Sequence, residues 1–269
     1  MATQNNPIGV MDSGVGGLTV VSELAKLLPG EDILYCADNI NVPFGNKSKE
    51  DIFVLSCNML KFMDAKKVKM VLLACNTISA MADKLQKEFE FPIISIIEPI
   101  AKRLGREKVP EIGLIATEYT VKSSAYKSVI SETNSDVIVH DHASKNLAAL
   151  IDKGDLDNPD IMIEVSSSMG KLMEKGTPPK VILGCTHYPI VEDLFRKAAP
   201  GIEFLDPAAE QVLFARDILK ADNLLQQGAG DIKGNLDIYT SGESWQFEQV
   251  LSRLKLGHAN MHSQLFDAK

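Results

Sequence analysis

The chain has 269 residues, of which 45% are hydrophobic and 24% charged, with a single tryptophan. This composition is typical of a globular protein with a full hydrophobic core, arranged as one large domain or two of ordinary size. The 36 acidic side chains outnumber the 28 basic ones, which gives a net charge of −8, and no stretch gathers Lys and Arg into a stripe. Nucleic acid is therefore excluded as an expected partner.

The N-terminal segment and the apolar runs indicate where the protein is located. Residues 1–7 are polar and have neither the charged start nor the apolar middle of a signal peptide. The longest apolar stretches, around 70–75 and 92–97, fall far short of the roughly 18 residues that a membrane span requires. We therefore predict a cytoplasmic protein without a membrane partner. Its four cysteines form no Cys-x-x-Cys pair and are expected to be free thiols there.

Short apolar runs alternate with helix-length amphipathic segments along the chain. This alternation is typical of a parallel sheet with crossover helices. Ser48 with Asp51, and Asp206 before Pro207, predict the starts of two helices. Strands are predicted at the runs rich in Ile, Val and Leu, which are 7–12, 31–36, 69–75, 93–97, 111–116, 136–140 and 180–185.

The sequence contains a weak internal repeat. The run 7–12 resembles the run 111–116, since both contain an Ile-Gly pair at the start of a predicted strand. Farther along each half, a predicted strand ends in a cysteine, Cys75 in the first half and Cys185 in the second, at a similar separation. The two halves are therefore expected to have related structures.

This repeat and the alternating elements predict the architecture. We expect an α/β fold of two pseudo-symmetric domains, each a mostly parallel sheet flanked by helices, with the active site in the cleft between them. The first domain is predicted to comprise residues 1–97 and 207–269, and the second residues 98–206. The C-terminal segment is thus expected to return and complete the first domain.

Three reactive side chains, Asp12, Cys75 and Cys185, are expected at the carboxyl ends of strands. Ligands of open α/β sheets bind at these ends, so the three side chains are expected to face one cleft. The residues that follow the cysteines, 76–77 and 186–187, stand where the next helices are expected to begin. Because helix N-termini offer free N–H groups to anions, a carboxylate ligand fits there.

Two cysteines in matching positions favour proton-transfer chemistry. A thiol acts as a base only when ionised, and its pKa of about 8.5 falls at a helix N-terminus or beside an imidazolium, which is the environment we predict for both. Racemisation removes a proton from one face of Cα and delivers another to the opposite face, which two acid/base groups across a cleft accomplish without a cofactor. Cys75 and Cys185 are predicted to be these groups, with Asp12 assisting Cys75 and His187 assisting Cys185.

Four motifs resemble those of the glutamate racemase family in order and spacing, over nearly the whole chain. They are Asp12–Thr19, Pro43–Gly45, Ala74–Thr77 and Gly184–Pro189. The resemblance implies interconversion of L- and D-glutamate for bacterial cell-wall precursors, with neither pyridoxal phosphate nor a metal, by a homodimer. It also implies a set of substrate-binding residues, which are Asp12, Ser13, Phe44, Gly45, Asn76, Thr77, Thr117, Thr186 and His187.

The sequence departs from the family's pattern at several positions. Phe44 stands where Tyr is usual, the pair 38–39 is Asp-Asn where Gly-Asp is common, and Ala116 replaces a common Gly. The segment 141–152 lacks a Cys-Pro loop, which in many relatives leads to a helix with Glu near the position of Asp152. Two alternatives therefore stay open: a racemase for aspartate or another acidic amino acid, and a racemase-like binding protein that has lost turnover.

The glycines at 14, 16 and 17 follow a strand and precede a helix, which suggests dinucleotide binding as a rival function. Thr19 occupies the place of the third glycine of that fingerprint, so the match is weak. His140 and His142 resemble a fragment of a metal site, but side chains two apart on an extended segment point to opposite faces. Cys36 and Cys57 are expected to be core residues without a part in the mechanism.

Overall fold

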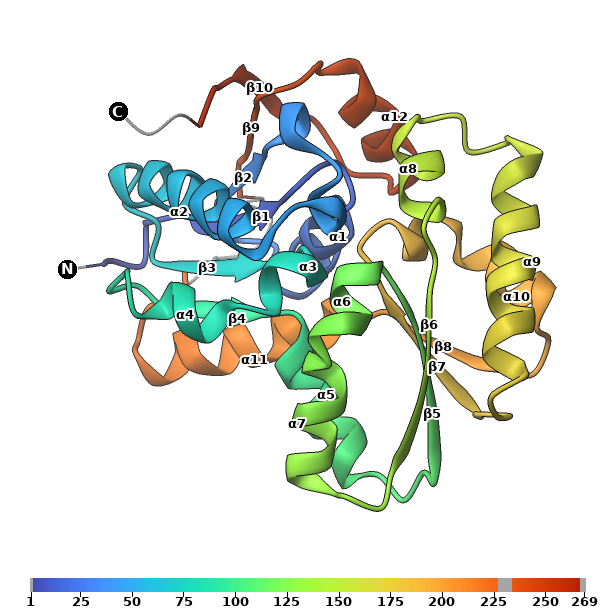
Figure 1. Cartoon of the computed structure of the whole chain (residues 1–269). Helices are drawn as coiled ribbons and strands as arrows, with labels where there is room; N and C mark the ends of the chain where they lie inside the picture. Colours follow the sequence, from blue (N-terminus) through green and yellow to red (C-terminus); the bar gives the residue numbers. More distant parts are fainter. Residues whose placement is uncertain (1, 227–233, 267–269) are drawn as a thin grey trace.

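Two parallel sheets form the centre of the computed structural model, which describes residues 2–226 and 234–266 (Figure 1). All strand pairings in this part of the chain are parallel. The first sheet has six strands in the order β10 (Asn260–Ser263), β9 (Leu236–Thr240), β2 (Ile33–Ala37), β1 (Ile8–Asp12), β3 (Met70–Leu73) and β4 (Ile93–Ser95). The second has four in the order β6 (Ile138–Ala143), β5 (Glu111–Ala116), β7 (Lys180–Gly184) and β8 (Glu203–Leu205). The predicted fold class is confirmed.

Helices connect the strands and cover both sheets. The predicted starts of α2 (Lys49–Ala65) and α11 (Ala208–Ala221) are confirmed, because Ser48 Oγ accepts the Asp51 N–H at 3.1 Å and Asp206 Oδ1 accepts the Ala208 N–H at 2.9 Å. No helix within residues 2–226 and 234–266 is long and apolar enough to cross a membrane. The helical segments are α1 (Leu18–Leu27), η1 (Asn39–Asn41), η2 (Phe44–Asn46), α2 (Lys49–Ala65), α3 (Asn76–Ser79), α4 (Ala82–Gln86), α5 (Ile97–Arg106), α6 (Glu118–Ser123), α7 (Ala125–Thr133), α8 (Leu147–Asp152), α9 (Pro159–Met173), η3 (Tyr188–Val191), α10 (Glu192–Ala198), α11 (Ala208–Ala221) and α12 (Trp245–Arg253).

The internal repeat is visible in the strand orders. The strands β2-β1-β3-β4 of the first sheet follow one another as β6-β5-β7-β8 do in the second. The shared Ile-Gly pair has the same packing in both sheets: a Cβ on Gly9 would lie 3.0 Å from Val71 Cγ2, and one on Gly113 would lie 2.7 Å from Val181 Cγ2. Each glycine thus lets a central strand pack closely against its neighbour's valine.

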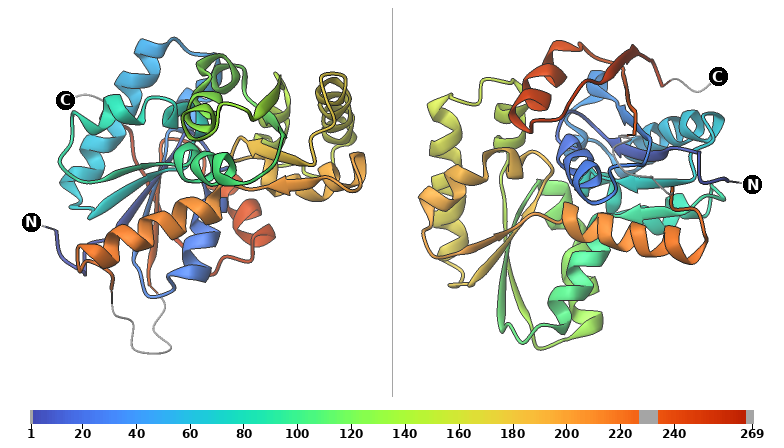
Figure 2. Two further views of the ribbon diagram at one scale, coloured as in Figure 1. Left: turned by 90° about the horizontal axis from the view of Figure 1, so that it is seen from below. Right: turned by 180° about the vertical axis from the view of Figure 1, so that it is seen from behind.

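Side chains of the first sheet alternate between two hydrophobic clusters. Ile8 and Val10 of β1 pack in the cluster that contains residues of α1 and α11, whereas Met11 packs in the cluster that contains residues of α2. This alternation follows from the two-residue period of a strand. Figure 2 shows helices on both faces of the first sheet.

The C-terminal part of the chain joins the first sheet. After β8, helix α11 packs against both α1 and α5, and β9 then pairs with β2 at the edge away from β1. The first sheet therefore takes strands from 8–95 and from 236–263, while the second takes them from 111–205. The domain limits at residues 97 and 207 stay a prediction.

A buried ion pair connects the N-terminal segment to the first sheet. Lys69 Nζ lies 2.5 Å from Glu31 Oε2, and the two side chains are 0% and 1% exposed. Lys69 Nζ also donates to the carbonyl oxygens of Gln4 at 2.8 Å and Leu224 at 3.0 Å. Glu31 Oε1 accepts the Gln226 N–H at 2.8 Å. Because every charge here has a partner, removing one charge leaves the other buried and unpaired.

We predict that Lys69→Met lowers the free energy of unfolding by about 3–5 kcal/mol, the usual effect of breaking a buried pair. Urea unfolding followed by circular dichroism measures it. The matched control is Lys26→Met, whose Lys side chain is 64% exposed in its pair with Glu23 and whose loss is expected to stay below about 1 kcal/mol. Equal losses in the two variants would contradict this account.

Candidate active site

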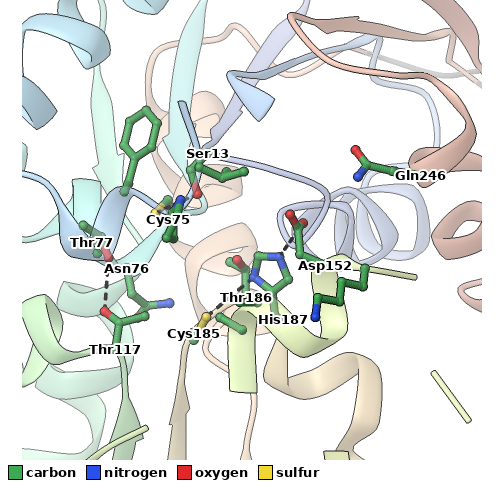
Figure 3. A pocket seen from close by; sticks show the side chains of 17 residues that line it. Ser13, Cys75, Asn76, Thr77, Thr117, Asp152, Cys185, Thr186, His187 and Gln246 are labelled. Atoms are coloured by element: carbon green, nitrogen blue, oxygen red, sulfur yellow. Dashed lines mark hydrogen bonds and ion pairs between the residues drawn. The ribbon is translucent and has the colours of Figure 1, made fainter. Parts of the chain in front are cut away.

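A cavity of about 220 Å³ lies where the carboxyl ends of the two sheets face each other (Figure 3). It is lined by predicted residues from both sheets, namely Ser13, Phe44, Gly45, Cys75, Asn76, Thr77, Thr117, Cys185, Thr186 and His187. Of the predicted site residues, Asp12 alone does not line it and is fully buried beside it. Residues that the sequence did not predict complete the wall, namely Val42, Pro43, Ala148, Ala149, Asp152, Lys153 and Gln246.

The parallel topology explains why these side chains meet. Ser13 follows β1, and Cys75 lies just after β3 at the N-cap position of α3. In the second sheet, Thr117 follows β5 and caps α6 by accepting the Thr120 N–H at 3.3 Å. Cys185 follows β7, the strand equivalent to β3. The two thiols thus reach the cavity from corresponding strands of opposite sheets.

Cys75 is a neutral thiol in this environment. Burial, together with the nearby carboxylate of Asp12, raises the pKa of the Cys75 thiol to about 12. The N–H of Ile78 in the first turn of α3 and the Ser13 hydroxyl, 3.7 Å from Cys75 Sγ, oppose this rise but do not outweigh it. The predicted lowering of this pKa is therefore wrong, because the sequence shows a helix start but not the burial around it.

Cys185 lies beside a histidine that an acid holds in place. His187 Nδ1 is 3.6 Å from Cys185 Sγ, and His187 Nε2 is 3.1 Å from Asp152 Oδ1 on α8. Burial disfavours a charge on His187, but its hydrogen bonds to Asp152 and Cys185 prevail and raise its pKa well above the ordinary 6.5. A positive imidazolium beside Cys185 stabilises negative charge that develops on the sulfur.

The residues after the two cysteines differ in local structure. Asn76 begins the helix α3, as predicted. The chain after Cys185 forms no helix at Thr186: the 3-10 segment η3 begins at Tyr188, and α10 follows it at Glu192. The predicted helix start at residue 186 is wrong, because residues 186 and 187 belong to the turn that places His187 beside Cys185.

Asp12 connects the two halves of the site. Its Oδ1 accepts the Gly14 N–H at 2.9 Å, and its Oδ2 accepts a hydrogen bond from the Thr186 hydroxyl at 3.0 Å. Asp12 is thus hydrogen-bonded both within its own half and to the residue that follows Cys185 in the other half. Burial raises the pKa of Asp12 to about 6, although the positive charge of His187 opposes the rise. Asp12 still acts on Cys75 electrostatically, because its charge is one cause of the raised thiol pKa.

The glycine loop packs closely against side chains of both halves. A Cβ on Gly16 would lie 2.4 Å from Thr186 Oγ1, and one on Gly17 would lie 2.7 Å from Asp12 Cβ. The carbonyl of Gly14 accepts the buried Tyr35 hydroxyl at 2.6 Å. Because side chains of the protein occupy the space beside Gly16 and Gly17, the loop has no room for a dinucleotide pyrophosphate there.

Amides and hydroxyls form a donor-rich wall next to Cys75. The hydroxyls of Thr77 and Thr117 are 3.2 Å apart, and the Tyr126 hydroxyl donates to Asn76 Oδ1 at 2.6 Å. Asn76 is 2% exposed, and its Nδ2 has no hydrogen-bond partner among the described residues. Such donors fit the carboxylate groups of an acidic ligand.

The sequence profile of the family described as Asp/Glu/Hydantoin racemase matches residues 8–215. The chain belongs to this racemase family. It is 37% identical to the glutamate racemase of Desulforudis audaxviator, over 90% of this chain and 91% of that protein. The resemblance to glutamate racemases is confirmed, and the chain is an enzyme of the isomerase class, as predicted.

Solved structures of glutamate racemases have the same fold as this racemase. An isoform from Bacillus anthracis superposes with a TM-score of 0.88 at 30% identity, covering 97% of this chain and 98% of the other. The enzyme from Francisella tularensis, solved in complex with D-glutamate, superposes with a TM-score of 0.88 at 28% identity, covering 98% and 99%. The similarity therefore extends over both sheets.

Asp152 and Gln246 are the most informative residues that the sequence analysis of this racemase missed. Gln246 lies on α12, and its Oε1 accepts Asn39 Nδ2 at 3.1 Å beside the cavity. Its position depends on the return of the C-terminal segment, which no local pattern shows. Asp152 had a signal, since it ends the segment 141–152 that the sequence analysis singled out as atypical.

Other side chains with possible chemistry lie elsewhere in the racemase. Cys36 is buried in β2 and Cys57 is half-buried in α2, and neither lines the cavity. His140 Nε2 lies 3.3 Å from Glu111 Oε2 on the neighbouring strand β5. Residues 2–226 and 234–266 contain no group of three or more His, Cys, Asp or Glu side chains arranged to hold a metal ion.

We predict that Asp152→Asn lowers the pKa of His187, which two-dimensional NMR of its imidazole across a pH series measures. In the native fold His187 keeps its proton more tightly than its ordinary pKa of 6.5 allows, and the pKa of Asp152 falls below 3.8 because hydrogen bonds from His187 and the Val15 N–H outweigh burial. The pair of His187 and Asp152 therefore stabilises the fold fully between pH 3.8 and pH 6.5. Its stabilisation is lost as pH rises through the folded pKa of His187 or falls through that of Asp152.

The control for this variant is Asp155→Asn, which neutralises an exposed acid just after α8 that makes no described contact with His187. An unchanged His187 pKa in Asp152→Asn, or the same fall in both variants, would contradict the role of Asp152.

Proposed function

We propose that this racemase interconverts L- and D-glutamate by moving a proton at Cα between Cys75 and Cys185. The observation that carries the proposal is the position of the two thiols, which line one cavity from corresponding strands of opposite sheets. Two acid/base groups on opposite walls fit a reaction that inverts one carbon centre. The names of the relatives, and the D-glutamate bound to the Francisella tularensis enzyme, support glutamate as the substrate.

The unequal surroundings of the two thiols suggest how they divide the roles of proton donor and base. Cys75, whose pKa is raised to about 12, is the proton donor of the resting state. Cys185, 3.6 Å from His187 Nδ1, is the base that removes the Cα proton. After one inversion Cys185 carries the proton and Cys75 the negative charge, and the reverse reaction starts from that state.

The charges of the substrate reduce the free-energy difference between the state with the negative charge on Cys185 and the state with it on Cys75. An amino acid bound in the cavity brings a positive α-ammonium group, which favours a thiolate nearby. Asp12, fully buried behind the cavity wall, adds negative charge that attracts this ammonium without lining the cavity. The substrate thus supplies the charge that makes the Cys75 thiolate accessible.

Uncharged donors hold the carboxylates of the substrate. The amide of Asn76 and the hydroxyls of Thr77 and Thr117 line the wall beside Cys75, and Ser13 and Thr186 line the cavity from opposite sheets. Their hydrogen bonds within the protein fix most of them before a ligand arrives. Because these donors are already in place, binding the substrate carboxylates needs little reorganisation of the protein.

The wider role of the reaction rests on the resemblance to glutamate racemases. The proposal places the enzyme in the cytoplasm as a homodimer that supplies D-glutamate for peptidoglycan precursors. It includes neither pyridoxal phosphate nor a metal, because the two thiols account for both proton transfers.

We predict that the native enzyme forms D-glutamate from L-glutamate, whereas Cys75→Ala and Cys185→Ala lose racemisation by at least about a thousandfold because each lacks one of the two proton-transfer groups. Circular dichroism of glutamate, started from either enantiomer, measures the rate. Each variant keeps one thiol, so we expect each to exchange the Cα hydrogen of only one enantiomer with solvent deuterium, and the two variants to differ in which one.

The control is Cys36→Ala, which removes a buried thiol outside the cavity and is expected to retain native turnover. Aspartate is tested in parallel. Turnover of aspartate without glutamate would overturn the proposed substrate and keep the mechanism, whereas full racemase activity in either cavity variant would overturn the two-thiol mechanism.

A further inference from the structure

Tyr126 has a polar contact that the proposed mechanism does not use. It lies in α7 beside the second sheet and is 1% exposed. Its hydroxyl is 2.6 Å from Asn76 Oδ1, at the start of α3 in the first sheet. A buried hydroxyl from one half of the molecule thus contacts a residue that lines the cavity from the other half.

The orientation of the Asn76 amide follows from hydrogen-bond accounting. A side-chain amide can turn over, exchanging its oxygen and nitrogen with little change in shape. With Oδ1 toward Tyr126, the hydroxyl proton has its acceptor, and only Nδ2 lacks a partner among the described residues. In the reverse orientation the hydroxyl proton would lack an acceptor and the amide oxygen would lack a donor. Leaving both of these buried groups without a partner costs more free energy than leaving Nδ2 alone without one.

The unpartnered nitrogen belongs to the cavity wall. Asn76 lines the cavity next to Cys75, and in Figure 3 its amide nitrogen is directed into the cavity. A buried N–H donor without a protein partner is disfavoured unless a ligand supplies an acceptor. Among the groups of an amino acid, only carboxylate oxygens accept such a hydrogen bond.

We propose that Tyr126 is a positioning residue for substrate binding: its hydroxyl fixes the Asn76 amide so that Nδ2 faces the cavity and donates to a substrate carboxylate. The inference rests on the proposed function and adds a residue that does not touch the substrate. Burial raises the pKa of Tyr126 well above its usual value, so the hydroxyl keeps its proton and remains the donor. Without this hydroxyl the amide is free to turn its oxygen toward the carboxylate, which repels it.

The test is Tyr126→Phe, which removes the hydroxyl and keeps the ring in the core. We expect KM for glutamate to rise about three- to tenfold in both directions, the usual effect of one hydrogen bond, with kcat changed less than twofold. Asn76→Ala is expected to raise KM by itself. In the Asn76→Ala background, Tyr126→Phe is expected to add less than about twofold, because no amide remains to be oriented.

The matched control is Tyr239→Phe, which removes a hydroxyl that accepts one hydrogen bond from Lys66 Nζ at 3.2 Å and does not line the cavity. Its KM is expected to equal that of the native enzyme. An unchanged KM in Tyr126→Phe, a fall in kcat alone, or multiplicative effects of Tyr126→Phe and Asn76→Ala would overturn the inference. A native enzyme that turned over no glutamate would overturn the proposed function and the inference together.

A measurement on the native chain avoids the possibility that Tyr126→Phe fails to fold. The two Nδ2 protons of Asn76 give a pair of side-chain NMR signals, identified by their loss in Asn76→Ala. We expect this pair to shift when D-glutamate is added. Signals that stay in place while other cavity residues respond would overturn the inference.

Discussion

Burial of ionisable groups between two sheets is the constraint on which the chemistry of this racemase depends. Asp12, Cys75 and His187 are all 6% exposed or less. Taking a charged side chain out of water is costly, so each group is neutral unless a neighbour supplies a compensating charge or hydrogen bond. Cys75 has too few such neighbours and remains a thiol, whereas His187 has Asp152 and is protonated.

The fold is nearly symmetric, but the charges around the two thiols are not. The strand orders of the two halves match, and Cys75 and Cys185 occupy corresponding strand ends. The first thiol contacts a serine hydroxyl, while the second contacts a histidine held by an acid. A symmetric backbone thus brings the two thiols to one cavity, and their neighbours differ.

The sequence predicted the centre of the fold better than its edges. The predicted strands are mostly buried runs of Ile, Val and Leu, whose pattern depends only on local sequence; the exception is β6, an edge strand without a buried residue. The missed strands β8, β9 and β10 are a three-residue strand, a half-buried strand and a polar edge strand, Asn260–Ser263. Their pairing depends on segments far away in the chain, so no local periodicity indicates them.

The candidate site shows the same division between local and distant information. Its cavity-lining residues next to strand ends were predicted because motifs and topology place them there. Asp152 was missed as a partner because its contact with His187 joins positions 35 apart in the sequence. The pKa of Cys75 was wrongly predicted because burial and the charge of Asp12 belong to the folded molecule.

The central claim, proton transfer between two thiols on opposite faces of Cα, has a direct isotopic test. L-Glutamate is converted in D₂O for less than about a tenth of the reaction, and the Cα hydrogen of both enantiomers is analysed by mass spectrometry after chiral separation. Two thiols predict D-glutamate with deuterium at Cα from the first turnover, because the donating thiol has exchanged with solvent, while the remaining L-glutamate keeps its hydrogen. D-Glutamate that retained the substrate's own Cα hydrogen would show return of the proton by one group and contradict the account.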